Sequence, residues 1–188
     1  MASLSLQDRV KIWNSFFFLA RRDAKALFEL RHSCKAVDHP FRPLGGMLGE
    51  EERGVLGTLA FCALAVEARA NHLIEKLVEE RKLTRKEGDA AMYLPPERKW
   101  FLLPRLAGRR RSLRADVDPH RAISKICSLR NDIVHVRFDR LSSRLPSSDL
   151  ILELFTQLVD AMEDLNDVLG DSRGRRKRVQ KMAQFTCS

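Results

Sequence analysis

The chain has 188 residues, a formal net charge of +9 at pH 7 and a pI near 9.8. Apolar residues make up 44% of the chain and charged residues 31%, which is the composition of one globular domain of ordinary size. This composition excludes a disordered chain, a collagen-like chain and a small disulfide scaffold. The excess of positive charge favours a polyanionic partner without saying which one.

Neither the amino terminus nor any internal segment suggests a membrane. Charged residues appear within Met1–Arg9, before the apolar core of a secretory leader could form, so no leader is expected. The longest uncharged stretch, residues 54–66, has 13 residues, whereas a membrane span needs about 20. Scattered cysteines without paired spacing are typical of a reducing compartment, so we expect a cytoplasmic protein. They are Cys34, Cys62, Cys127 and Cys187.

Apolar residues recur every three or four positions in the first half of the chain, which predicts helices rather than strands. Long helices are expected over residues 6–31 and 50–81, with a loop rich in proline and glycine between them. Thr84, followed by Glu87 three residues later, predicts a capped start of a short helix. Pro95 and the proline after it predict a turn or another helix start.

Two more long helices are expected in the second half. One has Pro119 in its first turn and continues to about Asp139, and the other runs from about Ser148 to Leu169 and stops at Gly170. The sequence therefore predicts an all-α fold, a bundle of four long helices plus one or two short helices. We assign the bundle to residues 1–170 and a basic tail to residues 171–188.

The third of these long helices carries three polar residues at the margin of a wide apolar arc. On a helical wheel Arg130 falls near the middle of that arc, so it must be paired or line a cavity, because an unpaired buried guanidinium is very costly. Asn131 and His135 are four residues apart and therefore share one edge of the helix. An arc this wide predicts two contacts, one with the core and one with a second protomer.

A partner for Arg130 is expected on the helix over residues 50–81. Glu67 and Asn71 are four residues apart there and interrupt its apolar stripe. We predict that Glu67, or as a second choice Glu75, lies near Arg130 and orients it. For Glu67 and Asn71 a supporting role is favoured over direct chemistry.

The segment Arg130-Asn-Asp-Ile-Val-His135 resembles the R-x4–6-H motif of the HEPN superfamily. The helix of Glu67 and Asn71, the Lys99-Trp100 segment and the last helix are similar to the general layout of HEPN bundles. The resemblance implies a HEPN-like bundle that forms a homodimer, in which two motifs face each other and make a metal-independent site for RNA cleavage. It also implies a toxin or defence role, for which an antitoxin protein would be a partner.

The resemblance also implies roles for the motif residues. His135 would exchange a proton with the ribose hydroxyl or the leaving oxygen, Arg130 would stabilise the phosphate in the transition state, and Asn131 would position the phosphate or His135. Some HEPN toxins carry a tyrosine two residues after the histidine, where a partner nucleotidyltransferase modifies it. Arg137 stands there in this chain, so that regulation is not expected.

Two segments hold the excess positive charge. Residues 97–114 contain seven basic residues against one acidic residue, and residues 171–188 contain six against one. Such segments suit contacts with RNA phosphates, although solvated surface is an equally good interpretation. The candidate RNA-binding residues are Arg109, Arg110, Arg111, Arg114 and Arg137.

Other interpretations stay open at this point. The chain could be a catalytically inactive HEPN-like module that binds RNA, a nucleotide or a protein, or a helical interaction protein without a nucleic-acid partner. His135 could be a partly exposed histidine bonded to Asn131 or to a carbonyl, with no chemistry. Neither a metal nor a cofactor is expected, since His32, Cys34 and His39 match no standard zinc spacing.

Overall fold

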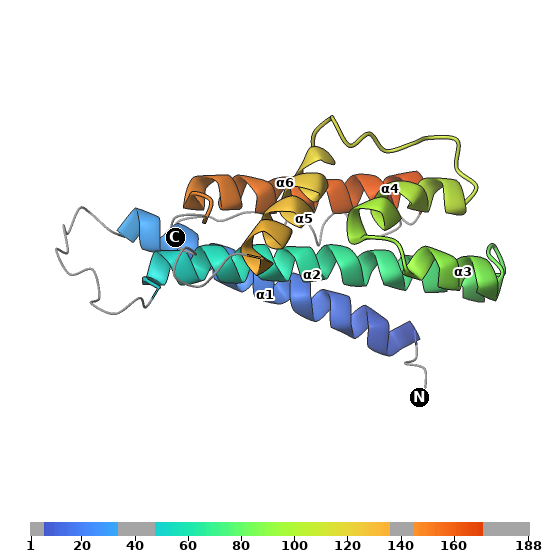
Figure 1. Ribbon diagram of the computed structural model, residues 1–188, viewed down its shortest axis with the longest axis horizontal. Coiled ribbons are helices and arrows are strands. Elements are labelled where there is room, and N and C mark those ends of the chain that lie inside the picture. Colours follow the sequence, from blue (N-terminus) through green and yellow to red (C-terminus); the bar gives the residue numbers. More distant parts are fainter. Residues whose placement is uncertain (1–5, 34–47, 136–144, 171–188) are drawn as a thin grey trace.

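The computed structural model describes residues 6–33, 48–135 and 145–170 (Figure 1). These residues form six helices and no strand, which confirms the predicted all-α bundle of four longer and two shorter helices for the described part of the chain. The helices are α1 (Leu6–Ser33), α2 (Glu50–Glu79), α3 (Arg85–Met92), α4 (Pro96–Leu106), α5 (Arg121–Val134) and α6 (Ser148–Leu169).

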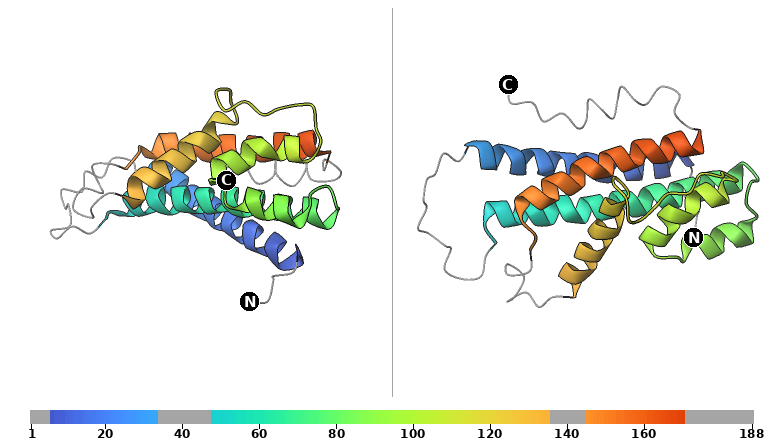
Figure 2. Two further views of the ribbon diagram at one scale, coloured as in Figure 1. Left: turned by 45° about the vertical axis from the view of Figure 1, so that its right-hand side comes forward. Right: turned by 90° about the horizontal axis from the view of Figure 1, so that it is seen from above.

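Helices α1, α2 and α6 lie side by side and enclose most of the core, with α1 running opposite to the other two (Figures 1 and 2). Phe17 of α1 stacks on Phe155 of α6 with 5.9 Å between the ring centroids. Helix α2 is central and is therefore buried on more than one face. Its fully buried residues include Ala65, Val66, Ala70 and Ile74.

Helices α4 and α5 pack against α2 on its other flank. Trp100 and Leu103 of α4 and Ile123 and Ile126 of α5 have no exposed surface. The carboxyl-terminal end of α5 then projects away from the bundle, as the view from above in Figure 2 shows. This end of the molecule is therefore open to solvent.

The predicted helix ends are mostly confirmed. The Thr84 hydroxyl accepts from the Glu87 amide, and the Glu87 carboxylate accepts from the Thr84 amide, which is a complete capping box at the start of α3. Ser147 caps α6, and Gly170 ends it with a φ of 79°, in the left-handed region that favours glycine.

Helix α5 is shorter than predicted. It begins at Arg121, so Pro119 precedes its first turn instead of lying in it, and it ends at Val134 with His135 as its C-cap. The rest of the predicted stretch, to about Asp139, lies outside the described residues. Val134 and His135 are both exposed, which means that packing against α2 no longer supports the helix at this point. The proline- and glycine-rich loop, Arg137 and the basic tail lie outside the described residues.

Within the described ranges, no helix combines the length and apolar character needed to cross a membrane. Cys62 and Cys127 are free thiols buried among apolar side chains, as their helical pattern predicts.

Candidate functional site

The carboxyl-terminal end of α5 carries the three motif residues, Arg130 and Asn131 on the helix and His135 as its C-cap, and we call these three residues the motif patch. Arg130, Asn131 and His135 are all exposed. The Arg130 guanidinium donates to Asn131 Oδ1 at 3.0 Å, and the His135 amide donates to the Asn131 carbonyl at 3.2 Å. The Arg130 and Asn131 side chains therefore lie together on the surface, and the exposed His135 follows Asn131 by one helical turn.

Arg130 is not buried as its place on the helical wheel suggested, and of the two expected arrangements, pairing or lining a cavity, it takes the second. Its side chain is exposed, and it forms no ion pair with any carboxylate in the described ranges. The helical wheel assumed a neighbour along the whole length of α5, whereas the last turns of α5 diverge from α2 (Figure 2). Arg130 thus remains available to a ligand.

A small pocket of about 70 Å³ lies between α2, the start of α4 and the end of α5. We call it the α2–α5 pocket. Glu67 and Arg130 both line it, so the two residues lie near each other as expected, without the direct pairing that the sequence suggested. The other residues that line it are Ala63, Leu64, Pro95, Pro96, Glu97, Cys127 and Asn131.

The cation beside Glu67 is Lys99 of α4, whereas the sequence predicted Arg130 there. The Lys99 side chain is only 3% exposed, and its Nζ donates to Asn71 Oδ1 at 2.8 Å and lies 3.9 Å from Glu67 Oε1. Burial lowers the pKa of the Lys99 ammonium, and the Glu67 carboxylate acts in the opposite direction. Sequence reasoning placed Lys99 among phosphate-seeking residues. Lys99 directly precedes the buried Trp100 on a helix that faces Glu67 and Asn71. This position was the signal that could have indicated its burial.

Cys127 forms part of the wall of the α2–α5 pocket. Burial first, and then the nearby carboxylates of Glu97 and Glu67, raise the pKa of its thiol to about 11, while Arg130 acts in the opposite direction. A thiol with this pKa is almost wholly protonated at neutral pH, so Cys127 is not a nucleophile there.

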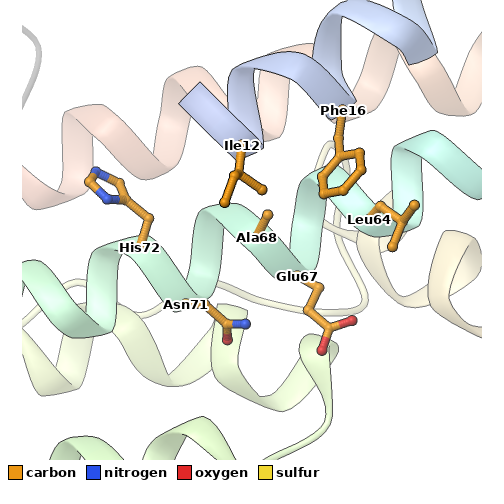
Figure 3. Close-up of a pocket in the computed structure, with 7 residues that line it drawn as sticks. All are labelled: Ile12, Phe16, Leu64, Glu67, Ala68, Asn71 and His72. Atoms are coloured by element: carbon orange, nitrogen blue, oxygen red, sulfur yellow. The ribbon is translucent and has the colours of Figure 1, made fainter. Parts of the chain in front are cut away.

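A larger pocket of about 250 Å³ lies between α1 and α2, and we call it the α1–α2 pocket (Figure 3). Ile12 and Phe16 of α1 form one side of it, and Glu67 and Asn71 of α2 lie on the other. It shares Leu64 and Glu67 with the α2–α5 pocket, so the two pockets are adjacent. Ala68 and His72 complete its lining.

The arginines of the loop before α5 have internal partners. Arg109 donates to the Leu169 carbonyl, Arg111 pairs with Asp164 at 2.8 Å, and Arg114 pairs with Asp116 at 2.7 Å. This loop leads into the start of α5, and Arg130 is near the far end of that helix, which at 14 residues is about 20 Å long. The loop is therefore separate from the motif patch. Arg110 is exposed.

A second buried polar group joins the same loop to the bundle. The Trp100 indole donates to His120 Nδ1 at 3.3 Å, and His120 Nε2 lies 2.9 Å from Asp164 Oδ2. Because an indole only donates, the imidazole hydrogen belongs on Nε2 and points at Asp164. Each ring nitrogen has a partner, so this arrangement holds the loop in place. Nothing in the sequence pattern singled out His120.

Comparison of the chain with family models, with curated proteins and with solved structures found no match. Among the described residues, no group of three or more His, Cys, Asp or Glu side chains is arranged to hold a metal ion.

Proposed function

We propose that this protein is a metal-independent RNA endonuclease of the HEPN kind that acts as a homodimer. The observation that carries the proposal is the joint exposure of Arg130, Asn131 and His135 at the carboxyl-terminal end of α5. An arginine and a histidine with only structural roles would form hydrogen bonds inside the bundle. Arg69 does so with Asn166, and His120 does so with Asp164.

The proposed reaction begins with the ribose 2′-hydroxyl, which attacks the adjacent phosphorus and gives up its proton to a base. The bond from phosphorus to the 5′ oxygen breaks, and that oxygen takes a proton from an acid. The products are a 2′,3′-cyclic phosphate and a free 5′-hydroxyl. One histidine cannot be base and acid in the same step, so His135 of each protomer takes one role.

Arg130 acts on the charge of the phosphate. A guanidinium presents several donors in one plane and stabilises the extra charge on the non-bridging oxygens in the transition state. Asn131, whose Oδ1 accepts from Arg130, fixes the direction of the guanidinium. Glu67 and Asn71 support the site from α2. A toxin or defence role with an antitoxin partner belongs to the same proposal.

The test is cleavage of a labelled single-stranded RNA in EDTA. Removing a general acid or base typically costs about 10²- to 10⁴-fold in rate, so we expect His135→Ala to lose that much activity. His32→Ala is the matched control, because His32 is an exposed histidine on α1. Arg130→Ala should also be inactive, whereas Arg98→Ala, which removes an exposed arginine of α4, should cleave normally.

Activity that vanishes in EDTA, or that survives in His135→Ala, would contradict the proposal. A second candidate function is an inactive HEPN-like module that binds RNA. It is favoured by the carboxylates of Glu67 and Glu97 beside Arg130, which lower the local positive potential. Salt-sensitive retention of RNA without any cleavage would support that candidate instead.

A further inference from the structure

We infer that the α1–α2 pocket binds the base of an unpaired guanine nucleotide. The inference rests on the proposed function only in placing that base within an RNA strand. The base would contact the apolar side of the pocket and the polar pair Glu67 and Asn71. The sequence motif gave these two residues only a role in supporting Arg130.

Lys99 sets the direction of the Asn71 amide. An ammonium group can only donate, so the contact of 2.8 Å from Lys99 Nζ must end on the amide oxygen of Asn71. The amide NH₂ then points elsewhere and is free to donate to a ligand. The side chain of Asn71 also lines the pocket, beside Glu67 and on the same side of α2 (Figure 3).

Glu67 supplies the acceptors. Its side chain is 39% exposed, and the only cation paired with it in the described ranges is Lys99, 3.9 Å from one carboxylate oxygen. Asn71 and Glu67 are four residues apart on α2 and so lie next to each other. Together they can offer a base one amide donor and the acceptors of one carboxylate at the polar edge of the pocket.

Guanine is the base whose Watson–Crick edge matches these groups. Its edge presents the O6 acceptor, the N1–H donor and the N2–H₂ donor in sequence. Adenine, cytosine and uracil each place a ring nitrogen or carbonyl acceptor where a carboxylate oxygen would repel it. Unpaired bases of RNA are recognised in this way, by hydrogen bonds to the Watson–Crick edge and by contact with apolar or aromatic side chains.

The apolar side of the pocket suits the face of the base. Figure 3 shows Ile12 and Phe16 pointing from α1 toward Ala68, with Leu64 at one end of the pocket and Glu67 and Asn71 along the edge of α2 that lies away from α1. Ile12 and Leu64 are each 36% exposed and so leave apolar surface that a base would cover. At about 250 Å³ the pocket is below the range of drug-sized sites and fits a single planar base.

The pocket also lies next to the proposed catalytic patch. Leu64 and Glu67 line both pockets, and Arg130 and Asn131 line the α2–α5 pocket on the far side of Glu67. A carboxylate this close to an RNA site would repel phosphates. The Glu67 carboxylate favours RNA binding when it accepts hydrogen bonds from a base. This role explains why an acidic residue lies beside Arg130.

The experiment measures binding rather than cleavage, with the wild-type protein and a short 2′-O-methyl RNA that cannot be cut. The oligonucleotide contains one guanine among uridines, and a second version carries inosine in its place, which lacks the N2 amino group. We expect inosine to weaken binding by about tenfold or more, because a hydrogen bond to a charged acceptor is lost. Guanosine monophosphate is added as a competitor. Its affinity shows whether the pocket prefers a guanine within RNA or a free guanine nucleotide.

Two variants address the same contacts from the protein side. Glu67→Gln should reduce the difference between guanine and inosine, because it weakens the acceptor of the N2 amino group. Asn71→Asp should weaken binding of both oligonucleotides, because an acceptor replaces the donor to O6, and the aspartate can still pair with Lys99 and preserve the fold. Glu79→Gln is the matched control, since Glu79 is an exposed residue of the same helix. Equal affinity of the wild type for guanine and inosine overturns the inference.

The outcomes separate this inference from the proposed function. A guanine preference without any cleavage of ordinary RNA supports the pocket and contradicts the nuclease. Cleavage without a guanine preference supports the nuclease and overturns the pocket. Tight binding of guanosine monophosphate with no binding of the oligonucleotide overturns the placement within RNA.

Discussion

At the scale of single residues, the site depends on which cation is buried. Lys99 is enclosed between α2 and α4, where it fixes Asn71 and faces Glu67, while Arg130 lies at the surface. In the enclosed position the Lys99 ammonium has Asn71 and Glu67 as partners, whereas the planar fork of Arg130 at the surface can make paired hydrogen bonds to a phosphate. Because the last turns of α5 diverge from α2, the motif patch is accessible (Figure 2).

The Cys127 thiol provides a measurable report on this environment. Its pKa of about 11, against a usual 9.0, keeps the thiol protonated until well above neutral pH. Since the thiolate is the reactive form, we expect alkylation of Cys127 at pH 8 to be about a hundredfold slower than that of an accessible cysteine, and to rise until about pH 11. Peptide mapping after iodoacetamide treatment measures this rate.

The same protein in urea is the control, where Cys127 should react with a midpoint near the usual value. Because Glu97 and Glu67 raise the pKa of the thiol, Glu97→Gln should move the midpoint to lower pH. A native midpoint at or below pH 9 would show that Cys127 is neither buried nor beside these carboxylates.

Residue-level prediction from the sequence worked where one helix alone decides the outcome. The four-residue spacing placed Glu67 and Asn71 on one side of α2, where both line the α1–α2 pocket. It did not identify Lys99, because its burial depends on how α4 meets α2, and no local pattern fixes that contact.

At the scale of helices, the ends that carry their own chemical signal were predictable. A capping box, a serine cap and a terminal glycine act locally, so α3 and α6 begin or end close to their predicted residues. The end of α5 has no such signal. Its length depends on where packing against α2 ceases, and the helical wheel could not show that the helix diverges.

The glycine that ends α6 gives a stability prediction. Gly170 has a φ of 79°, which costs a residue with a Cβ roughly 1–2 kcal/mol. We expect Gly170→Ala to lower the free energy of unfolding by about that amount, as measured by urea denaturation. Asparagine tolerates the left-handed region better, so Gly170→Asn should recover most of the loss.

The comparison of the two variants isolates the backbone effect. Any Cβ at this position would come within 2.7 Å of the Arg109 guanidinium, so alanine and asparagine disturb that side chain equally. Equal losses in the two variants would show that the contact with Arg109, rather than the backbone conformation, determines the cost.

At the scale of the whole molecule, the bundle is complete on one side and open on the other. Apolar packing joins α1, α2 and α6 along the core, with the α1–α2 pocket at its surface, whereas the end of α5 projects into solvent (Figure 2). Val134 there is 62% exposed, and Ile133 beside it is only half-buried. In the proposed homodimer this end of α5 meets its symmetry mate, which brings two copies of His135 together.

The dimer proposal predicts that a charge at Val134 will separate the protomers. A symmetric interface contains each residue twice, so Val134→Glu would place two carboxylates in an apolar contact. We expect this variant to sediment as a monomer, while the wild type sediments as a dimer, and to cleave RNA no faster than His135→Ala. Val117→Glu is the matched control, since Val117 is 44% exposed in the loop before α5.

The concentration dependence of cleavage distinguishes loss of the dimer from damage to the site. If the composite site needs two protomers, wild-type activity per molecule should fall on dilution, and Val134→Glu should recover activity at high concentration, because it leaves Arg130 and His135 unchanged. Activity per molecule that is constant on dilution, together with a fully active monomeric Val134→Glu, would mean that one protomer holds the whole site.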